Sequence, residues 1–313
     1  MKHITLILTI IALLACTNHK AQNSNNQHQD SIQSQQSTIN SHENCPTILG
    51  GQAESTVLSR MAKNGEGDSF LIPNSSLLIP KEVLLGKFNP TTDSNFVLIP
   101  EHIASNKSMY CHHETFEAYL AMRDSALRDG ITLTIVSATR NFDRQLQIWN
   151  RKWQNTQCPK NCPPKLGGQA QRAEGVCNTD SLQLTCDICK VRSIMRYSSM
   201  PGTSRHHWGT DLDFISVEPD YWTHGEGLRI YNWLCANAHK FGFFQPYTAD
   251  PARTGYAEER WHWSYAPLSK PYLEVYRQKI TAEDITGFSG SYLVDYLNII
   301  ESHVLGITTP HHF

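Results

Sequence analysis

The sequence has no long apolar run after residue 16, so no later segment is suited to cross a bilayer as a single helix. It also lacks an excess of either charge. With a formal net charge of −2 there is no electrostatic reason to expect nucleic acid as a partner. No internal repeat is visible, which argues against a solenoid or a propeller. A hydrophobic fraction of 40% and a charged fraction of 18% are typical of an ordinary globular protein, with one large domain or two small ones.

The first sixteen residues predict export. Lys2 and His3 form a short basic start, and the apolar run that follows is too short for a permanent membrane helix. The run ends in Leu-Leu-Ala-Cys16, which resembles the bacterial lipobox, in which the cysteine becomes the lipidated first residue of the mature protein. The alternative is a plain signal peptide with a chance cysteine. We therefore expect a lipoprotein signal peptide over residues 1–16 and a protein anchored by lipid at the periplasmic face of a bacterial membrane.

Residues 17–45 are rich in Asn, Gln, Ser and His and have few apolar side chains. Such a segment buries too little surface to offset its ordering entropy, so we expect a flexible tether that leads to a domain over residues 46–313. Eight cysteines follow Cys16, and five of them fall between residues 158 and 189. In an oxidising compartment this pattern favours disulfide bonds over a structural zinc site, and it predicts a cysteine-rich insert at about 155–195 that lies outside the core scaffold. The pairing cannot be read from the sequence.

The order of predicted elements indicates an α+β domain. Apolar periodicity predicts helices, whereas β-branched alternation and short apolar runs predict strands. The helices are expected at 115–128, 143–153, 226–240 and 292–304, and the strands at 131–136, near 210–215 and near 260–265.

The densest group of chemically useful side chains lies between Ser204 and Asp213. His206 and Asp213 are seven residues apart, which is not the spacing of the helical two-histidine zincin arrangement. They can converge if the chain turns at Gly209 and continues as a strand, in which Asp211 and Asp213 lie on the same side. Imidazole and carboxylate are ordinary zinc ligands, but a catalytic zinc site needs a third protein ligand.

A third ligand is available in the segment Glu-Glu259-Arg-Trp-His262-Trp. In a strand His262 points away from the two tryptophans that flank it, and Glu259 lies where the strand begins. A carboxylate beside a zinc-activated water can act as a general base and then protonate the departing amine. Arg140, on the loop that leaves the strand at 131–136, is suited to hold a substrate carboxylate with two hydrogen bonds.

Three motifs together resemble the VanY-type D-alanyl-D-alanine carboxypeptidases, which belong to a wider group with lysostaphin, the D-Ala-D-Ala metallopeptidases and sonic hedgehog. The family pattern has Ser-x-x-Arg-x4-Gln, then Ser-x-His-x6-Asp, then Glu-x-Trp-His. The sequence has all three in this order, at Ser137/Arg140/Gln145, Ser204/His206/Asp213 and Glu259/Trp261/His262. The resemblance extends over roughly 85–270, interrupted by the cysteine-rich insert.

The resemblance implies a small antiparallel sheet that carries a zinc site and is flanked by helices, as in the hedgehog and D-Ala-D-Ala peptidase group. It also implies a functional role for each of seven residues: His206, Asp213 and His262 as Zn²⁺ ligands, Glu259 as catalytic base, and Arg140, Gln145 and Ser204 as substrate-binding residues. Asp211 departs from the pattern, because many relatives have a small alanine there. It can be a partner of a ligating histidine or can reach solvent, and it is not assigned to the metal.

These roles imply a zinc metallopeptidase that removes the terminal D-alanine from peptidoglycan stem peptides. The specificity for D-stereochemistry is inherited from the family and is not shown by any residue. The alternatives are an L,D-carboxypeptidase, an endopeptidase that cuts cross-links, and a non-catalytic cell-wall binding lipoprotein; Glu259 argues against the last, because a binding module needs no base. His207 is interpreted as structural, and the remaining histidines without ligand-like spacing, such as His112 and His113, as surface residues.

Overall fold

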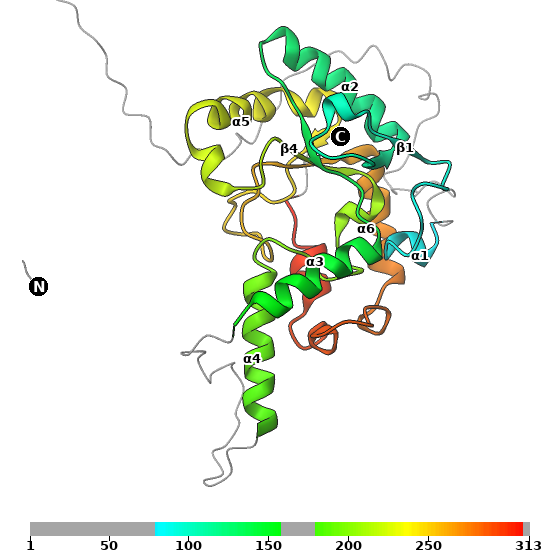
Figure 1. The fold of residues 1–313 in the computed structure, drawn as a ribbon, viewed down its shortest axis with the longest axis vertical. Helices are drawn as coiled ribbons and strands as arrows, with labels where there is room; N and C mark the ends of the chain where they lie inside the picture. Colours follow the sequence, from blue (N-terminus) through cyan, green and yellow to red (C-terminus); the bar gives the residue numbers. More distant parts are fainter. Residues whose placement is uncertain (1–78, 158–178, 309–313) are drawn as a thin grey trace, which may run out of the picture. The chain divides into compact units, whose positions relative to one another are not determined.

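The computed structural model describes residues 79–157 and 179–308 (Figure 1). The predicted signal peptide, lipobox cysteine and tether, and part of the cysteine-rich segment, therefore lie outside the described residues. Within the described ranges no helix combines the length and the apolar character needed to cross a membrane.

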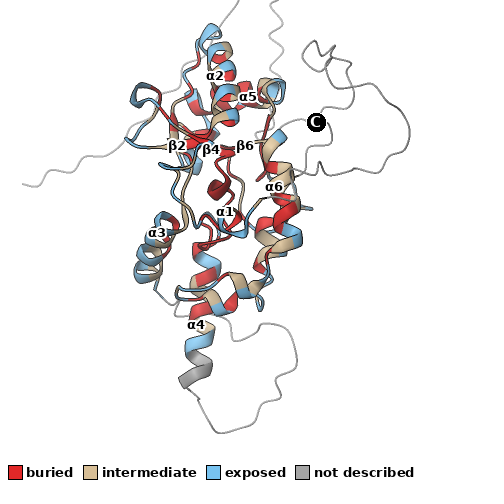
Figure 2. Cartoon of the chain, turned by 90° about the vertical axis from the view of Figure 1, so that its right-hand side faces the viewer, coloured by how far each residue is buried: buried red, intermediate tan, exposed pale blue. Residues whose placement is uncertain are grey.

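A four-stranded antiparallel sheet forms the centre of the fold. Its strands are β3 (Ile135–Ser137), β4 (Asp211–Phe214), β5 (Phe243–Phe244) and β6 (His262–Tyr265), in the order β3-β4-β6-β5. A separate two-stranded ribbon pairs β1 (Phe96–Leu98) with β2 (Tyr110–His112). All four residues of β4 are buried, so the central strands are covered on both faces (Figure 2). The predicted α+β class is confirmed.

Two hydrophobic clusters flank the sheet. One unites the sheet with α2 (His113–Arg128) and α5 (Gly225–Asn237), through side chains such as Tyr119 and Phe214. The other unites α3 (Phe142–Asn155), α4 (Thr179–Ile194) and α6 (Ala266–Lys279) with the chain that follows α6. In both views α2 and α5 lie on one side of the strands, and α3 and α4 lie on the other (Figures 1 and 2).

Local signals explain where the two helices nearest the site begin and end. The His112 side chain accepts a hydrogen bond from the Glu114 amide at the start of α2, and Asn141 does the same for the Arg144 amide at the start of α3. Gly130, with φ of +70°, follows the last turn of α2 in the left-handed conformation that commonly ends helices. The helices predicted at 115–128 and 143–153 are confirmed.

Three predictions about secondary structure are wrong in part. The strand expected over 131–136 is limited to Ile135–Ser137, because Ile131 and Leu133 are buried without pairing to a neighbouring strand. The helix expected over 292–304 is split into a 3-10 turn at Ser291–Leu293 and a π-helical turn at Ile300–Val304. The helix expected over 226–240 ends at Asn237 and continues as a 3-10 turn to Phe241.

The described end of the cysteine-rich segment belongs to the core, contrary to the expectation of an insert outside it. Ile188, Val191 and Ile194 of α4 recur every three residues, as on one face of a helix, and are buried in the second cluster. Cys111 is a buried free thiol, whereas Cys189 and Cys235 are disulfide-bonded. Disulfide pairing within 158–178 falls outside the described residues and stays a prediction.

Two histidines make stability depend on pH: His112, which is buried, and His303, which is half-buried. Burial, aided by the charge of His113, lowers the pKa of His112 to about 4, and burial, aided by Arg253, lowers that of His303 to about 4. Because an unfolded histidine titrates near 6.5, the unfolded chain takes up protons first as pH falls. We expect the free energy of unfolding of the zinc-free protein to decrease from pH 6.5 towards pH 4. Urea denaturation should show a smaller decrease for His303→Gln than for the exposed-site control His224→Gln, and equal decreases would contradict this origin.

Candidate active site and metal centre

The turn at Gly209 brings together the two halves of the motif that contains His206 and Asp213. His206 lies in a 3-10 helix at Arg205–Trp208, and Gly209 then adopts φ of +71° before β4 begins. A side chain at Gly209 would collide with its surroundings, because its Cβ would overlap the Phe96 ring and lie 2.8 Å from the His112 amide nitrogen. The predicted turn is therefore confirmed, and only glycine suits both its conformation and its space.

The pairing of β4 with β6 supplies the third member. Asp213 is directly opposite His262 in the antiparallel register, and Asp211 is opposite Ser264. Side chains directly opposite each other on one face lie about 4.5–5.5 Å apart at Cβ. The structure thus brings His206, Asp213 and His262 to one point, and their candidate ligand atoms all lie within 4.8 Å of one another.

The spacing of the donor atoms is close to that of the ligands of a tetrahedral zinc ion. His206 Nε2 lies 3.3 Å from Asp213 Oδ2, and His262 Nδ1 lies 3.0 Å from Asp213 Oδ1. Ligand atoms about 2.0–2.2 Å from zinc in a tetrahedral site would be about 3.3–3.6 Å apart. His206 Nε2 and Asp213 Oδ1 are buried, and apart from these ion-pair contacts, whose geometry is not that of a hydrogen bond, neither has a partner among the described residues. Buried polar atoms normally have a partner, and a metal ion would supply one here.

Both histidines are oriented by hydrogen bonds from their other ring nitrogen. His206 Nδ1 lies 2.9 Å from the Ala138 carbonyl oxygen, which leaves Nε2 for a metal. His262 Nε2 lies 2.9 Å from Asp211 Oδ1, which leaves Nδ1. Such partners fix the tautomer and the direction of a ligating imidazole. Asp211 is fully buried and does not reach solvent, so the structure decides between the two alternatives that its position left open.

The charges in this cluster are strongly coupled. Burial alone would raise the pKa of Asp213, but the contacts with His206 and His262 hold it well below its usual range. Burial lowers the pKa of His262, yet the carboxylates of Asp211 and Asp213 outweigh burial and raise it to about 9. Without a metal ion, His262 is therefore protonated at neutral pH and takes the place of a cation between two carboxylates. A metal ion must displace that proton to bind.

Glu259 lies beside the three candidate ligands. Its Oε2 is 3.6 Å from His262 Nδ1, and the side chain is buried. Burial raises its pKa to about 8, with the charge of Asp213 adding to the effect and nearby cations opposing it. A carboxyl group whose pKa is close to neutral can both take up and release a proton, which general acid–base catalysis requires.

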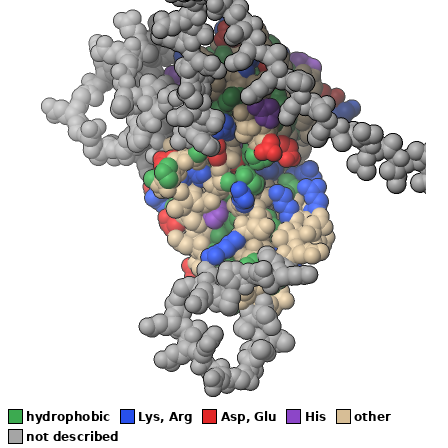
Figure 3. Space-filling model, turned by 90° about the vertical axis from the view of Figure 1, so that its left-hand side faces the viewer, with side chains coloured by type: hydrophobic (Ala, Val, Ile, Leu, Met, Phe, Trp, Pro, Cys, Tyr) green, Lys and Arg blue, Asp and Glu red, His purple; other side chains and the backbone are tan. Residues whose placement is uncertain are grey.

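The cluster opens into a cavity of about 460 Å³. Arg140, Arg151 and Lys152 line it from the side of α3, and none of them forms an ion pair with a described carboxylate. Figure 3 shows a face on which several Lys and Arg side chains are exposed, together with some Asp and Glu side chains. The other lining residues are Ile148, Tyr197, Ser198, Ser199, Ser204, Arg205, His206, Asp213, Val217, Glu218, Pro219, Tyr247, Tyr256, Glu259, Trp261 and His262.

The structure separates the three predicted substrate-binding residues. Arg140 lines the cavity and its buried Nε has no hydrogen-bond partner among the described residues, so it is available to a ligand. The Ser204 hydroxyl also lines the cavity and is likewise without a described partner. Gln145 does not line the cavity: it is fully buried in α3, and its Nε2 donates to the Ser199 carbonyl 2.7 Å away. Gln145 therefore supports the cavity wall at Ser199, and its position does not favour direct contact with a substrate.

His207 has the structural role that the sequence predicted. Its Nε2 accepts a hydrogen bond from the Gly202 amide, and its Nδ1 lies 2.5 Å from the Arg140 carbonyl oxygen. Burial lowers its pKa to about 3, so the ring is neutral. In contrast, the expectation that His112 is a surface residue is wrong, because its ring is buried at the start of α2. His112, His113 and Glu114 also lie close enough to hold a metal, but His112 Nδ1 already caps the helix.

Sequence reasoning missed several residues of the site. Arg205 is buried beside the three candidate metal ligands, and the Tyr247 ring centroid lies 4.8 Å from that of the His262 ring. Arg205 directly precedes His206, and this neighbouring position is the feature of the sequence that could have placed it near the site. Tyr247 and Tyr256 lie in a loop without periodicity, and nothing in the sequence placed them beside β6.

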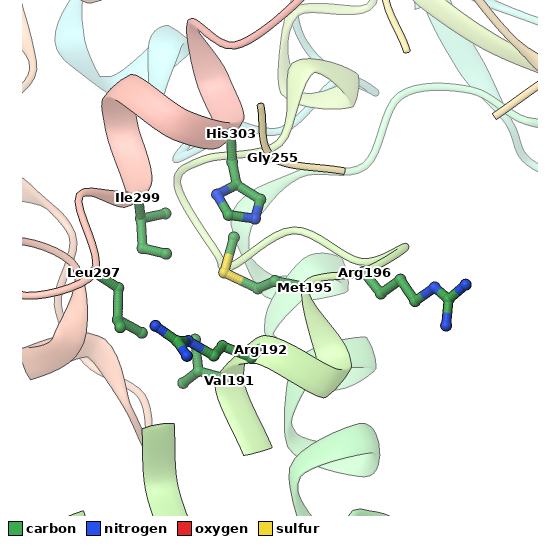
Figure 4. Close-up of a pocket in the computed structure, with 8 residues that line it drawn as sticks. All are labelled: Val191, Arg192, Met195, Arg196, Gly255, Leu297, Ile299 and His303. Carbon is green, nitrogen blue, oxygen red and sulfur yellow. The ribbon is translucent and has the colours of Figure 1, made fainter. Parts of the chain in front are cut away.

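A second cavity, of about 380 Å³, lies away from the candidate metal ligands (Figure 4). Arg192 of α4 and Arg196 of the turn that follows line it, with the Arg196 side chain directed away from the other lining residues, and His303 lies on the opposite side from Arg192. Val191, Met195, Gly255, Leu297 and Ile299 complete its lining. No carboxylate among the described residues lines this cavity, so it offers no carboxylate base and no acidic metal ligand there.

Comparison with known proteins identifies the family. The family profile described as D-alanyl-D-alanine carboxypeptidase, VanY, matches residues 108–268, which is more than half of the chain and includes every candidate catalytic, metal-ligating and substrate-binding residue. The chain belongs to the VanY family. This confirms the resemblance that the three motifs predicted.

Individual relatives of this VanY-family chain are distant. VanYB in complex with D-alanine-D-alanine is 21% identical, with a TM-score of 0.39 over 67% of this chain and 92% of that chain. The LdcB LD-carboxypeptidase is 20% identical, with a TM-score of 0.39 over 63% of this chain and 77% of that chain. An uncharacterized protein of Haemophilus influenzae is 31% identical over 81 residues, which is 21% of this chain and spans only 60% of that protein.

Proposed function

We propose that this VanY-family protein is a zinc carboxypeptidase that removes the C-terminal D-alanine from peptidoglycan stem peptides. The observation that carries the proposal is the convergence, in one cavity, of a metal-ligand set, a base and a carboxylate anchor. His206, Asp213 and His262 would hold Zn²⁺, Glu259 lies beside them, and Arg140 lines the same cavity. Family membership supports the peptidase class.

Each residue of the site has a separate role in the proposed hydrolysis. When bound, zinc supplies a Lewis acid that polarises the scissile carbonyl and acidifies a water molecule. Glu259 Oε2 takes the proton from the attacking water and delivers it to the departing amine. A nearby divalent cation lowers the pKa of Glu259 from its metal-free position, so the residue starts the cycle as a carboxylate. Arg140 binds the terminal carboxylate of the peptide, which makes the enzyme an exopeptidase.

The location of the protein is part of the same proposal. The sequence of residues 1–16 supports a lipid anchor at Cys16, and the polar residues 17–45 would give the domain reach from the periplasmic face of the membrane to the cell wall. Peptidoglycan is the polymer that an enzyme so placed would meet. Disulfide bonds among the exported cysteines would be expected in that compartment.

Mass spectrometry of muropeptides incubated with the zinc-loaded full chain tests the proposed activity. Loss of one terminal D-alanine from pentapeptides, abolished by EDTA, would support it. Trimming of tetrapeptides alone would favour an L,D-carboxypeptidase, and cleavage of cross-linked dimers would favour an endopeptidase. If zinc binds and no muropeptide changes, a non-catalytic cell-wall binding role would replace the proposal.

Arg140→Gln distinguishes an exopeptidase from an endopeptidase. Hydrogen bonds to charged groups contribute about 1.5–3 kcal/mol, so kcat/KM for free-ended peptides should fall roughly 10- to 100-fold, mainly through KM. The backbone contacts of Arg140 with His206 and His207 do not involve its side chain and should persist. The same substitution at Arg144, on the exposed side of α3, is the control. An unchanged KM for free-ended peptides would contradict the carboxylate anchor.

A further inference from the structure

An ion pair is buried directly behind the metal cluster. Arg205 Nε lies 3.1 Å from Asp211 Oδ1, and the exposed fractions of the two side chains are 1% and 0%. Arg205 Nη2 also donates to Ser264 Oγ at 2.6 Å, and its guanidinium group packs 4.8 Å from the Trp208 ring centroid. Removing two charged side chains from water costs free energy that their attraction does not always offset. The contribution of a buried ion pair to stability is therefore a weak explanation for its presence.

The same carboxylate faces the ring of a candidate ligand. Asp211 Oδ1 lies 2.9 Å from His262 Nε2, on the opposite side of the ring from the nitrogen that faces Asp213. The Thr210 hydroxyl donates to the other oxygen, Oδ2. Three donors therefore fix the Asp211 carboxylate, and the carboxylate in turn fixes the direction of the His262 ring.

We propose that Arg205 and Asp211 act as a positioning pair that presents His262 Nδ1 to the metal. Asp211 accepts a hydrogen bond from His262 Nε2–H and so selects the tautomer whose Nδ1 lone pair is free. Arg205 supplies the positive charge that keeps a second carboxylate stable beside Asp213. The strand register makes this possible, because Asp211 and Asp213 lie on the same face of β4, one opposite Ser264 and one opposite His262.

Zinc affinity, measured by competition with a chelator, tests the pair. Loss of such a partner typically weakens metal binding about 10- to 100-fold, and Asp211→Ala should show a loss of this size. Asp211→Asn should rescue part of it, because an amide oxygen still accepts the Nε2 proton. The absorption spectrum of the cobalt-substituted protein should change in Asp211→Ala, since the ring is no longer held in place.

A double variant separates positioning from folding. Arg205→Met with Asp211→Val removes both charges at similar volume, a change that is often neutral or stabilising for a buried pair. We expect this variant to keep the thermal unfolding of the zinc-free wild type and still to bind zinc about 10- to 100-fold more weakly. Wild-type zinc affinity in the double variant would overturn the proposal, whatever its catalytic activity.

The unpaired basic wall of the cavity carries a second, independent inference. Arg140, Arg151 and Lys152 line the same cavity, and the pKa of Lys152 is lowered by burial and by the two arginines. Glu259 opposes this effect, but no described carboxylate pairs with Arg151 or Lys152. Arg151 is exposed and Lys152 is half-buried, and a ligand that brings negative charge to the two side chains would offset the repulsion between them.

We infer that Arg151 and Lys152 form a subsite for a second substrate carboxylate, beside the terminal one held by Arg140. This inference rests on the proposed carboxypeptidase function. The chemistry favours stem peptides whose residue before the terminal D-Ala-D-Ala pair has a side chain that ends in a carboxylate. Peptides with a neutral side chain at that position leave the two cations without a partner.

Two synthetic peptides of equal length test the subsite: acetyl-aminoadipyl-D-Ala-D-Ala, with a side-chain carboxylate, and diacetyl-lysyl-D-Ala-D-Ala, without one. We expect the zinc-loaded full chain to show about 10- to 100-fold higher kcat/KM for the acidic peptide, and Arg151→Gln with Lys152→Gln to remove most of that preference. Arg192→Gln, in the second cavity (Figure 4), should keep it. Cleavage of both peptides at equal kcat/KM would overturn the subsite alone, whereas cleavage of neither would overturn the proposed function.

Discussion

Glu259→Gln is expected to abolish peptide hydrolysis while the protein still binds zinc. The amide is close in size to the carboxylate but cannot take a proton from water, and general acid–base catalysis typically contributes about 10²- to 10⁴-fold to the rate. Glu259 lies next to the candidate ligands but is not one of the three, so zinc content should remain near one per chain. Steady-state kinetics on a D-Ala-D-Ala peptide, together with metal analysis of the same sample, measure both quantities.

The neighbouring carboxylate provides a matched control. Glu258 precedes Glu259 in the chain but forms an ion pair with Arg260 at 3.0 Å and does not line the cavity. Glu258→Gln should therefore retain turnover. If Glu259→Gln retained wild-type kcat with zinc bound, another group would have to move the proton, and the role assigned to Glu259 would be abandoned.

Asp213→Asn is expected to weaken zinc binding more than any change outside the three ligands. The substitution removes the negative ligand from the set and leaves both histidines in place. Loss of a residue that hydrogen-bonds to a metal ligand already lowers metal affinity about 10- to 100-fold. Loss of a charged ligand itself should lower zinc affinity by more than that. Hydrolysis should fall in parallel and should recover in part at high zinc concentration, which isothermal titration and activity assays can follow.

A carboxylate at the cavity rim is the control for this variant. Glu218 lines the same cavity but is not among the residues that could hold the ion, so Glu218→Gln should bind zinc as the wild type does. Unchanged zinc affinity in Asp213→Asn would show that the metal binds elsewhere. His112, His113 and Glu114 would then be the next group to test.

Much of the candidate site could be predicted because its residues obey local rules. Strand alternation placed Asp211 and Asp213 on one face, and the glycine turn explained how His206 could approach them. The cross-strand register that sets Asp213 opposite His262 joins segments almost fifty residues apart, and no local rule predicts it. The three ordered motifs nevertheless identified the right residues to bring together.

The features that could not be predicted depend on tertiary contacts. Arg205 is a charged side chain that would ordinarily be placed at the surface, and only the buried carboxylate of Asp211 explains its position. Gln145 matched a family motif but is enclosed by α3 and the Ser199 segment. The motif therefore identified the residue but not its contact with the Ser199 carbonyl. The chain after α6 has helical periodicity but folds into short turns, since packing against the second cluster overrides a weak local preference.

The way the second cluster is assembled limits how the chain can be shortened. The family match begins at residue 108, yet Leu84 and Leu85 are buried, and the Leu84 carbonyl accepts a hydrogen bond from Trp208 Nε1 at 3.1 Å. At the other end, Tyr276 donates to the Gly202 carbonyl at 2.8 Å, beyond the last matched residue, 268. Both contacts brace the segment that carries His206. A fragment cut at the boundaries of the family match would therefore lose two contacts that hold the segment of His206, the first of the three candidate metal ligands.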